Sequence, residues 1–407
     1  MNEADLQRTV IQMLKDKKIT RAITNIGVFR GRRKASKPGF REYSVRNILT
    51  DRYDSAVVWI FDRLANWDIQ LVGGVKPTNI SLTKTDRLFP DIVAYDDNRN
   101  FIVFELKVGS KTEREAVTEL FAYVFELRTL MPNLNNHEIS LVIIGENFGT
   151  LLSHAVLQVL SFFGLKVMCL RPLYMADLHF EIVDPLRALG MEDHRLSEDS
   201  FSVYSICLYQ ERNISPKANR SILRILKVAE DMLLDRANRL GSNGFYFAHE
   251  NRDISDEVGS VARYYLTIAL VDPFKLLNMD ALLMRKTNIS KILLDMAQGC
   301  DSHLQNHFWE LTREAVGFLN KFYAIRYETP VSYRQFSRSL GGWRNVSAIS
   351  CNVWGEFGEF VREMIYAPKT GGDFFNEELD HTNPFCLWEV FEHMFENEPA
   401  EPGYQNY

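Results

Sequence analysis

Two carboxylates and a lysine in the first part of the chain have the types and spacing needed for metal-dependent hydrolysis. Asp91 follows a proline at the start of one β-like run, and Glu105 and Lys107 end the next such run. The five polar residues 96–100 separate the two runs, which is typical of a β-hairpin. Side chains alternate along a strand, so Glu105 and Lys107 point to one face. The pattern predicts that this hairpin brings all three groups together.

The hairpin also predicts a register. If Tyr95 pairs with Phe101, Asp91 lies opposite Glu105. Two carboxylates placed there would be about 5 Å apart and would repel each other. A divalent cation between them removes the repulsion, and hard oxygen ligands favour Mg²⁺ or Mn²⁺. We therefore expect Asp91 and Glu105 to bind metal, with the carbonyl oxygen of Leu106 as a further ligand.

Lys107 would lie beside this metal and assist the attack of water. It could orient or help deprotonate the water, or stabilise charge in the transition state. Metal charge and partial burial are expected to lower its pKa. An exposed strand face with an ordinary ion pair is the alternative, because E-x-K occurs by chance about once in such a chain. The apolar run Phe101–Phe104 favours a buried strand, where Glu and Lys need a functional reason.

The elements that must position these groups predict an α/β domain over residues 1–171. A helix that begins after Asn2 places Glu3 on the same face as its apolar stripe. Apolar runs then predict an α-β-β-β-α-β core with a mixed sheet. The expected strands are 69–75, 88–95, 101–108, 139–144 and 165–170, and the expected later helices are 57–64, 113–131 and 152–163.

The rest of the chain predicts a different architecture. Residues 172–215 look like a connecting segment that contains one strand, 201–209. In residues 216–407 apolar residues recur at helical spacing, so we expect a mostly α-helical C-terminal domain. Its role would be substrate selection, dimerisation or regulation. A faint helix-turn-helix pattern at Gln335–Arg344 is more simply explained by ordinary helix packing.

The site and its setting resemble the PD-(D/E)XK, or restriction-endonuclease-like, nuclease superfamily. Pro90-Asp91 matches the first half of the signature, and Glu105-Leu106-Lys107 matches the second. The resemblance covers about residues 1–171, and its α-β-β-β-α-β core is the order expected above. It implies that the Asp and the Glu bind metal and that the Lys works with the nucleophilic water.

The resemblance implies further site residues. An acid on the first helix often joins the site in this family, and Glu3 stands there, although a favourable helix dipole would also explain it. Some branches carry a Q-x-x-x-Y element on the helix after the lysine strand. Tyr123 matches its tyrosine, but Glu119 stands where glutamine is usual. Glu119 is therefore either an accessory site residue or a surface acid.

A basic segment of the same domain has the composition of a nucleic-acid contact. Between Val28 and Arg46 there are seven positive residues and one acid, with aromatic residues among them. Phosphate contacts combined with stacking use such a mixture, whereas a solvated loop is the alternative. The predicted nucleic-acid-binding residues are Arg30, Arg32, Arg33, Lys34, Lys37 and Arg41.

Composition sets wider limits. The 407 residues suit two domains, and a net charge of −6 gives no global attraction to nucleic acid. Five cysteines without a C-x-x-C pair argue against a disulfide framework, a zinc knuckle or an iron–sulfur cluster. Neither a signal peptide nor a membrane-spanning run is evident, so we expect a cytoplasmic protein without a membrane partner.

Together these features predict a Mg²⁺- or Mn²⁺-dependent DNA endonuclease, with RNA as the alternative substrate. The metal would activate water and neutralise the scissile phosphate. One site per chain cuts one strand, so cleavage of both strands favours a homodimer. Analogy with the family suggests host defence or restriction. A catalytically inactive nucleic-acid-binding or scaffold protein is the other alternative, against which the intact Asp91, Glu105 and Lys107 argue.

Overall fold

The computed structural model divides the chain into two compact units, which meet in the sequence between residues 193 and 194. Residues 1–193 make up most of the first unit, and residues 194–407 make up most of the second. The structure describes all residues except 36–43, 74–78, 82–87, 108–112, 190–195, 210–215, 252–261, 278, 299–300, 333–345, 367–379 and 396–407.

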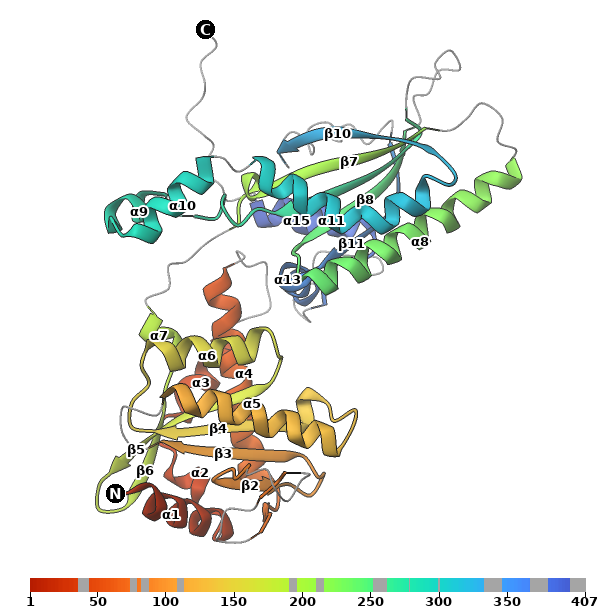
Figure 1. Cartoon of the computed structure of the whole chain (residues 1–407). Coiled ribbons are helices and arrows are strands. Elements are labelled where there is room, and N and C mark those ends of the chain that lie inside the picture. The colour runs from red at the N-terminus through yellow and green to blue at the C-terminus, as the bar shows by residue number, and fades with distance from the viewer. Residues whose placement is uncertain are drawn as a thin grey trace. The chain divides into compact units, whose positions relative to one another are not determined.

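The first unit is built on a six-stranded sheet in the order β1-β2-β3-β4-β5-β6 (Figure 1). The strands β3, β4 and β5 are parallel, and the remaining neighbours are antiparallel. The strands are β1 (Gln70–Leu71), β2 (Ile92–Tyr95), β3 (Phe101–Lys107), β4 (Ile139–Gly145), β5 (Lys166–Tyr174) and β6 (Leu178–Ile182). The helices are α1 (Glu3–Lys15), α2 (Ile19–Ala22), α3 (Ile26–Ala35), α4 (Val45–Asn66), α5 (Glu113–Leu130), α6 (Thr150–Ser161) and α7 (Pro185–Leu189). The predicted mixed α/β architecture is confirmed.

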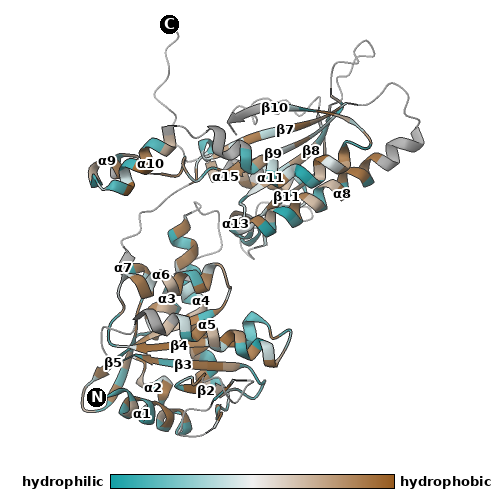
Figure 2. Cartoon of the chain, viewed as in Figure 1, coloured by the Kyte–Doolittle hydropathy of each residue, from teal (hydrophilic) through white to brown (hydrophobic). Residues whose placement is uncertain are grey.

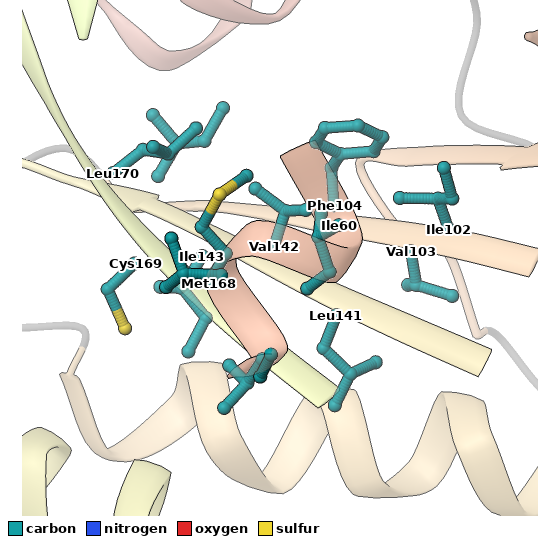
Figure 3. Close-up of a cluster of buried hydrophobic side chains, with 14 of the residues drawn as sticks. Ile60, Ile102, Val103, Phe104, Leu141, Val142, Ile143, Met168, Cys169 and Leu170 are labelled. Carbon is teal, nitrogen blue, oxygen red and sulfur yellow. The ribbon is translucent and has the colours of Figure 1, made fainter. Parts of the chain in front are cut away.

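Burial explains why these segments fold as they do. Every residue of β4 is buried, as expected for a parallel strand covered by helices on both faces. Figure 2 shows β3 and β4 mostly in the hydrophobic colour, whereas the helices carry both colours. Figure 3 shows part of the core, with Ile60 of α4 among side chains of β3, β4 and β5. At the N-terminus, the Asn2 side chain accepts the Asp5 backbone N–H at 2.8 Å and caps α1 as predicted.

The β2–β3 hairpin has the predicted register, because Tyr95 pairs with Phe101 and Val93 with Val103. Its loop is fixed by the carboxylate of Asp96, which is 1% exposed. Asp96 Oδ1 accepts hydrogen bonds from the backbone N–H groups of Asn98 and Asn100, both at 2.9 Å. The side-chain amide of Asn100 donates to both oxygens of the same carboxylate, at 3.0 and 2.9 Å. A slip of one residue would break this set of bonds.

One expectation about the first unit needs correction. The segment 172–215, expected to be a connection, contains the end of β5 and all of β6 and α7, so the first sheet extends past residue 171. The strand β6 alternates buried and half-exposed residues over only five positions, which made its signal weak. The expected strand at 201–209 is confirmed as β7 (Phe201–Tyr209), but β7 belongs to the second sheet.

The second unit contains an antiparallel sheet beside its helices, whereas the sequence had predicted a mostly α-helical domain. It is built on a five-stranded antiparallel sheet in the order β10-β7-β9-β8-β11. Besides β7, the strands are β8 (Gly244–Asn251), β9 (Tyr264–Val271), β10 (Ala324–Ser332) and β11 (Val346–Trp354). The helices are α8 (Pro216–Leu240), α9 (Met279–Arg285), α10 (Asn288–Gln298), α11 (Asp301–Leu319), α13 (Gly355–Tyr366) and α15 (Pro384–Phe395).

Helices cover both faces of this second sheet, which explains the error. Tyr246 of β8 lies in the core formed with α8 and α11, whereas Phe245 contacts Phe357 of α13 and Phe391 of α15. Strands buried on both faces read as continuous apolar runs, which have no period of two. The predicted Gln335–Arg344 element lies outside the described residues. Within the described part of the chain, no helix is long and apolar enough to span a bilayer.

The loop carboxylate provides a test of the hairpin. Asp96→Ala removes the acceptor for Asn98 and Asn100 and leaves Arg63, whose Nε lies 3.7 Å from Asp96, buried without an opposite charge. We expect a loss of roughly 3 kcal/mol in the free energy of unfolding, measured with urea. The exposed neighbour Asp97 is the matched control, and Asp97→Ala should change it by less than about 1 kcal/mol. Equal effects would show that Asp96 does not fix the loop.

Candidate active site

The predicted carboxylates meet at one end of the β2–β3 hairpin. The last ladder pair is Ile92 with Phe104, so one further step places Asp91 opposite Glu105. Asp91 Oδ2 accepts a hydrogen bond of 2.7 Å from the backbone N–H of Leu106. Leu106 therefore contacts the site through its N–H group, and its predicted carbonyl ligand stays a prediction. The expected arrangement of Asp91 beside the Glu105 strand end is present.

Lys107 is held between two glutamates. Its Nζ atom lies 2.7 Å from Oε1 of Glu105 and 2.7 Å from Oε2 of Glu119. Glu105 is 3% exposed, whereas the side chain of Glu119 is 40% exposed. Glu119, at the position where the family that the sequence resembles usually has glutamine, therefore belongs to this cluster and contacts the lysine from α5. Its reading as an unconnected surface acid does not fit this geometry.

The electrostatics of this cluster follow from burial. Burial, together with the charge of Asp91, raises the pKa of Glu105 to about 9. Burial also raises the pKa of Asp91 to about 6, although the hydrogen bond from Leu106 opposes this. Burial acts to raise the pKa of Glu119 too, but its hydrogen bonds with Glu105 and Lys107 outweigh burial and lower it. At neutral pH and without metal, Glu105 thus holds a proton while Glu119 carries the charge that balances Lys107.

Lys107 differs from expectation. Burial acts to lower the pKa of Lys107, but hydrogen bonds with Glu105 and Glu119 outweigh burial and raise it. The sequence had predicted a pKa lowered by burial and by the charge of a bound metal, whereas without metal the two glutamates outweigh burial. A lysine held in its charged form is a donor and a source of positive charge, and a poor base at neutral pH.

A divalent cation would fit this site in two respects. Oε2 of Glu105 is buried and has no hydrogen-bond donor among the described residues. The charge of two ionised carboxylates, whose burial raises both pKa values, would be neutralised by one dication. The described residues contain no group of three or more His, Cys, Asp or Glu side chains that could hold a metal. Asp91 and Glu105 would therefore need water or substrate oxygens to complete the shell, which Mg²⁺ ordinarily accepts.

The first helix contributes two groups. Glu3 is the exposed first residue of α1, and its charge acts to raise the pKa of Asp91. Gln7, one turn later, donates from Nε2 to the backbone carbonyl of Asp91 at 2.5 Å. Sequence analysis missed Gln7, although its spacing of four residues from Glu3 places both on one helix face. The helix thus fixes the backbone that carries the first carboxylate.

Tyr123 acts on the other side of the same backbone segment. It is buried, and its hydroxyl donates to the carbonyl oxygen of Phe89 at 3.2 Å. Burial, together with the charges of Glu105, Glu119 and Asp91, raises the pKa of Tyr123. The residue matched to the family's tyrosine is therefore a neutral hydroxyl that positions the chain just before Pro90.

The predicted basic contacts are only partly available. Arg30 forms an ion pair with Asp62, and Arg32 lies 2.7 Å from both Asp54 and Asp184. Arg33 is exposed on α3. The side chain of Lys34, and the whole of Lys37 and Arg41, lie outside the described residues. Arg30 and Arg32 stabilise the first unit itself, which the sequence did not reveal because their partners are 22 to 152 residues away.

In comparisons with protein-family models, with curated proteins and with solved structures, no match was found. The resemblance to the PD-(D/E)XK superfamily is therefore one of signature residues alone.

The raised pKa of Glu105 predicts how stability depends on pH. The folded state holds a proton that the unfolded state releases, so stability is fullest below about pH 4.5 and falls as pH rises toward about 9. Glu105→Gln keeps the neutral shape and should flatten this fall, measured by denaturant unfolding with EDTA present. Asp97→Asn, an exposed acid in the neighbouring loop, should follow the wild type. A Glu105→Gln curve parallel to the wild type would contradict the assignment.

Proposed function

We propose that the chain is a metal-dependent nuclease that uses Mg²⁺ or Mn²⁺ to hydrolyse phosphodiester bonds. The observation that carries the proposal is the pairing of half-buried Asp91, just before β2, with buried Glu105 on β3, with Lys107 on the same face. Placing a buried acid beside a half-buried one costs stability and serves no packing purpose, whereas a cation site explains the pair. The buried, unpartnered Oε2 of Glu105 supports the same conclusion.

A bound metal would lower the pKa of its water and neutralise the scissile phosphate. Asp91 would present one carboxylate oxygen, because the other accepts the Leu106 N–H group. Glu105 would lose its proton as the cation enters, so that affinity increases with pH. Lys107, kept charged by Glu119, would donate to an oxygen that becomes negative in the transition state. Because it stays charged, Lys107 would not abstract the proton of the attacking water.

DNA is the proposed substrate, and RNA is the alternative that the same chemistry allows. A homodimer would provide two sites for cleavage of both strands. A cytoplasmic role in host defence or restriction completes the proposal by analogy alone. Incubation of the full chain with plasmid, linear duplex, single strands and RNA, each with Mg²⁺, Mn²⁺ or EDTA, distinguishes the substrates. Sedimentation of the protein with and without duplex DNA tests the dimer.

Metal binding can be tested without catalysis. Asp91→Asn removes one charge from the proposed metal pair and should reduce Mn²⁺ affinity at least tenfold in calorimetry. The wild-type affinity should increase from pH 6 to pH 8, because Glu105 must lose its proton. Asp97→Asn is the matched control and should bind as the wild type does. Equal affinity in the Asp91 and Asp97 variants would exclude the proposed metal ligands.

A variant of Lys107 distinguishes an effect on catalysis from an effect on substrate binding. Lys107→Ala should lower the cleavage rate by about two orders of magnitude or more, because it removes a donor to the transition state. Binding of nucleic acid in Ca²⁺ should stay within about threefold of the wild type. Glu119→Gln should leave part of the activity, since an amide can still accept from Lys107. Near wild-type cleavage by Lys107→Ala would show that the lysine has only a structural role.

A further inference from the structure

A cavity of about 490 Å³ lies in the first unit, apart from the acidic cluster. Its walls come from α3 and the residues before it, from the segment after β4, and from β5, β6 and α7. The lining residues that matter here are Phe29, Arg32, Phe148, Arg171 and Arg187. This volume is within the range of small-molecule sites, roughly 300–1,000 Å³.

The walls of this cavity are fixed by hydrogen bonds. Asn25, just before α3, exchanges two bonds with the backbone of Ile182, at 2.9 and 2.8 Å. The hydroxyl of Tyr53 on α4 donates to the carbonyl oxygen of Val183 at 2.5 Å. The edge of the sheet and the two helices are therefore held in place, so the cavity is preformed.

Positive charge exceeds negative charge on the lining. The lining residues include three arginines, Arg32, Arg171 and Arg187, and two acids, Glu181 and Asp184. Arg171 lies 3.1 Å from Glu181, and both side chains are about two-fifths exposed. Arg187 is exposed, and no ion pair links it to a described residue. An anionic ligand would therefore gain a free arginine.

Arg32 offers a second sign of a missing partner. Its two terminal nitrogens contact Asp54 and Asp184, each at 2.7 Å, while its Nε atom is buried without a hydrogen-bond partner. A buried donor of this kind ordinarily has an acceptor. The guanidinium also lies over the ring of Phe29, 4.6 Å from the centroid. The cavity thus combines arginine donors with aromatic surface, as nucleotide-binding sites do.

The register relates this cavity to the acidic cluster. Lys107 pairs with Gly145 of β4, and the preceding residue Ile144 pairs with Leu170 of β5. Arg171 is therefore level with Lys107, two strands away, and its side chain points to the same face. Neighbouring strands are about 4.8 Å apart, so the two backbones are about 10 Å apart. This is roughly three steps of a stacked strand at about 3.4 Å each.

We propose that this cavity binds one nucleotide, with its phosphate on Arg187 and Arg171 and its base against Phe148. In the substrate strand this nucleotide would lie about 10 Å from the scissile phosphate. This placement rests on the proposed nuclease function. A free mononucleotide has the same chemistry and is the other source of the ligand. The substrate strand would then be positioned by this cavity, whereas the sequence had assigned that role to the basic segment between Val28 and Arg46.

Binding of two probes to the full chain in Ca²⁺ tests this proposal. The probes are a fluorescent oligothymidylate of about twelve nucleotides and the mononucleotide dTMP. Arg187→Glu should weaken oligonucleotide binding at least tenfold, and the salt slope should fall by about 0.7 for each lost phosphate contact. Arg187→Lys should restore part of the affinity. Arg21→Glu is the matched control, because Arg21 is also an exposed arginine of the first unit, outside the cavity lining.

The outcomes separate the two proposals. If dTMP alone binds the wild type and not Arg187→Glu, the ligand is a free nucleotide, and the site stands even if no cleavage is found. If only the oligonucleotide depends on Arg187, the cavity belongs to the substrate path. If Arg187→Glu and Arg21→Glu bind both probes equally well, the nucleotide site is wrong, whatever the cleavage assay with Asp91→Asn shows.

Discussion

The burial of Glu105 is the constraint on which the candidate active site depends. This carboxyl lies near the end of the buried strand β3, opposite a second acid, and burial raises its pKa to about 9. A site that is unfavourable for two negative charges is favourable for a divalent cation, which would restore both charges and neutralise them. The neighbouring residues determine how this unfavourable pair is held.

Three elements hold it. The helix α1 fixes the Asp91 backbone through Gln7, and α5 contributes Glu119 to Lys107. The Asp96 loop fixes the register that brings β2 and β3 together at the correct residues. Each contact is local to the hairpin or to one helix that packs on it, so the site belongs entirely to the first unit.

Local sequence patterns were sufficient to predict the hairpin. Contacts between residues far apart in the sequence could not be predicted in this way. The alternation of side chains and a five-residue loop were enough to place Asp91, Glu105 and Lys107 on one face. The charged state of Lys107 depends in part on Glu119, twelve residues later on another element. Whether Arg32 can contact nucleic acid depends on its ion pair with Asp184. The sheet of the second unit escaped prediction because its strands are buried on both faces and lack a period of two.

Glu119 changes the chemistry that a similar site could perform. A glutamine at that position would accept from Lys107 without adding negative charge beside it. A glutamate instead keeps Lys107 protonated and leaves the proton of the metal-free cluster on Glu105. Because Glu105 holds a proton and Glu119 balances Lys107, the cluster without metal keeps about one net negative charge at neutral pH, that of Asp91. Entry of a cation would then be coupled to the loss of that proton, and Lys107 would remain charged throughout.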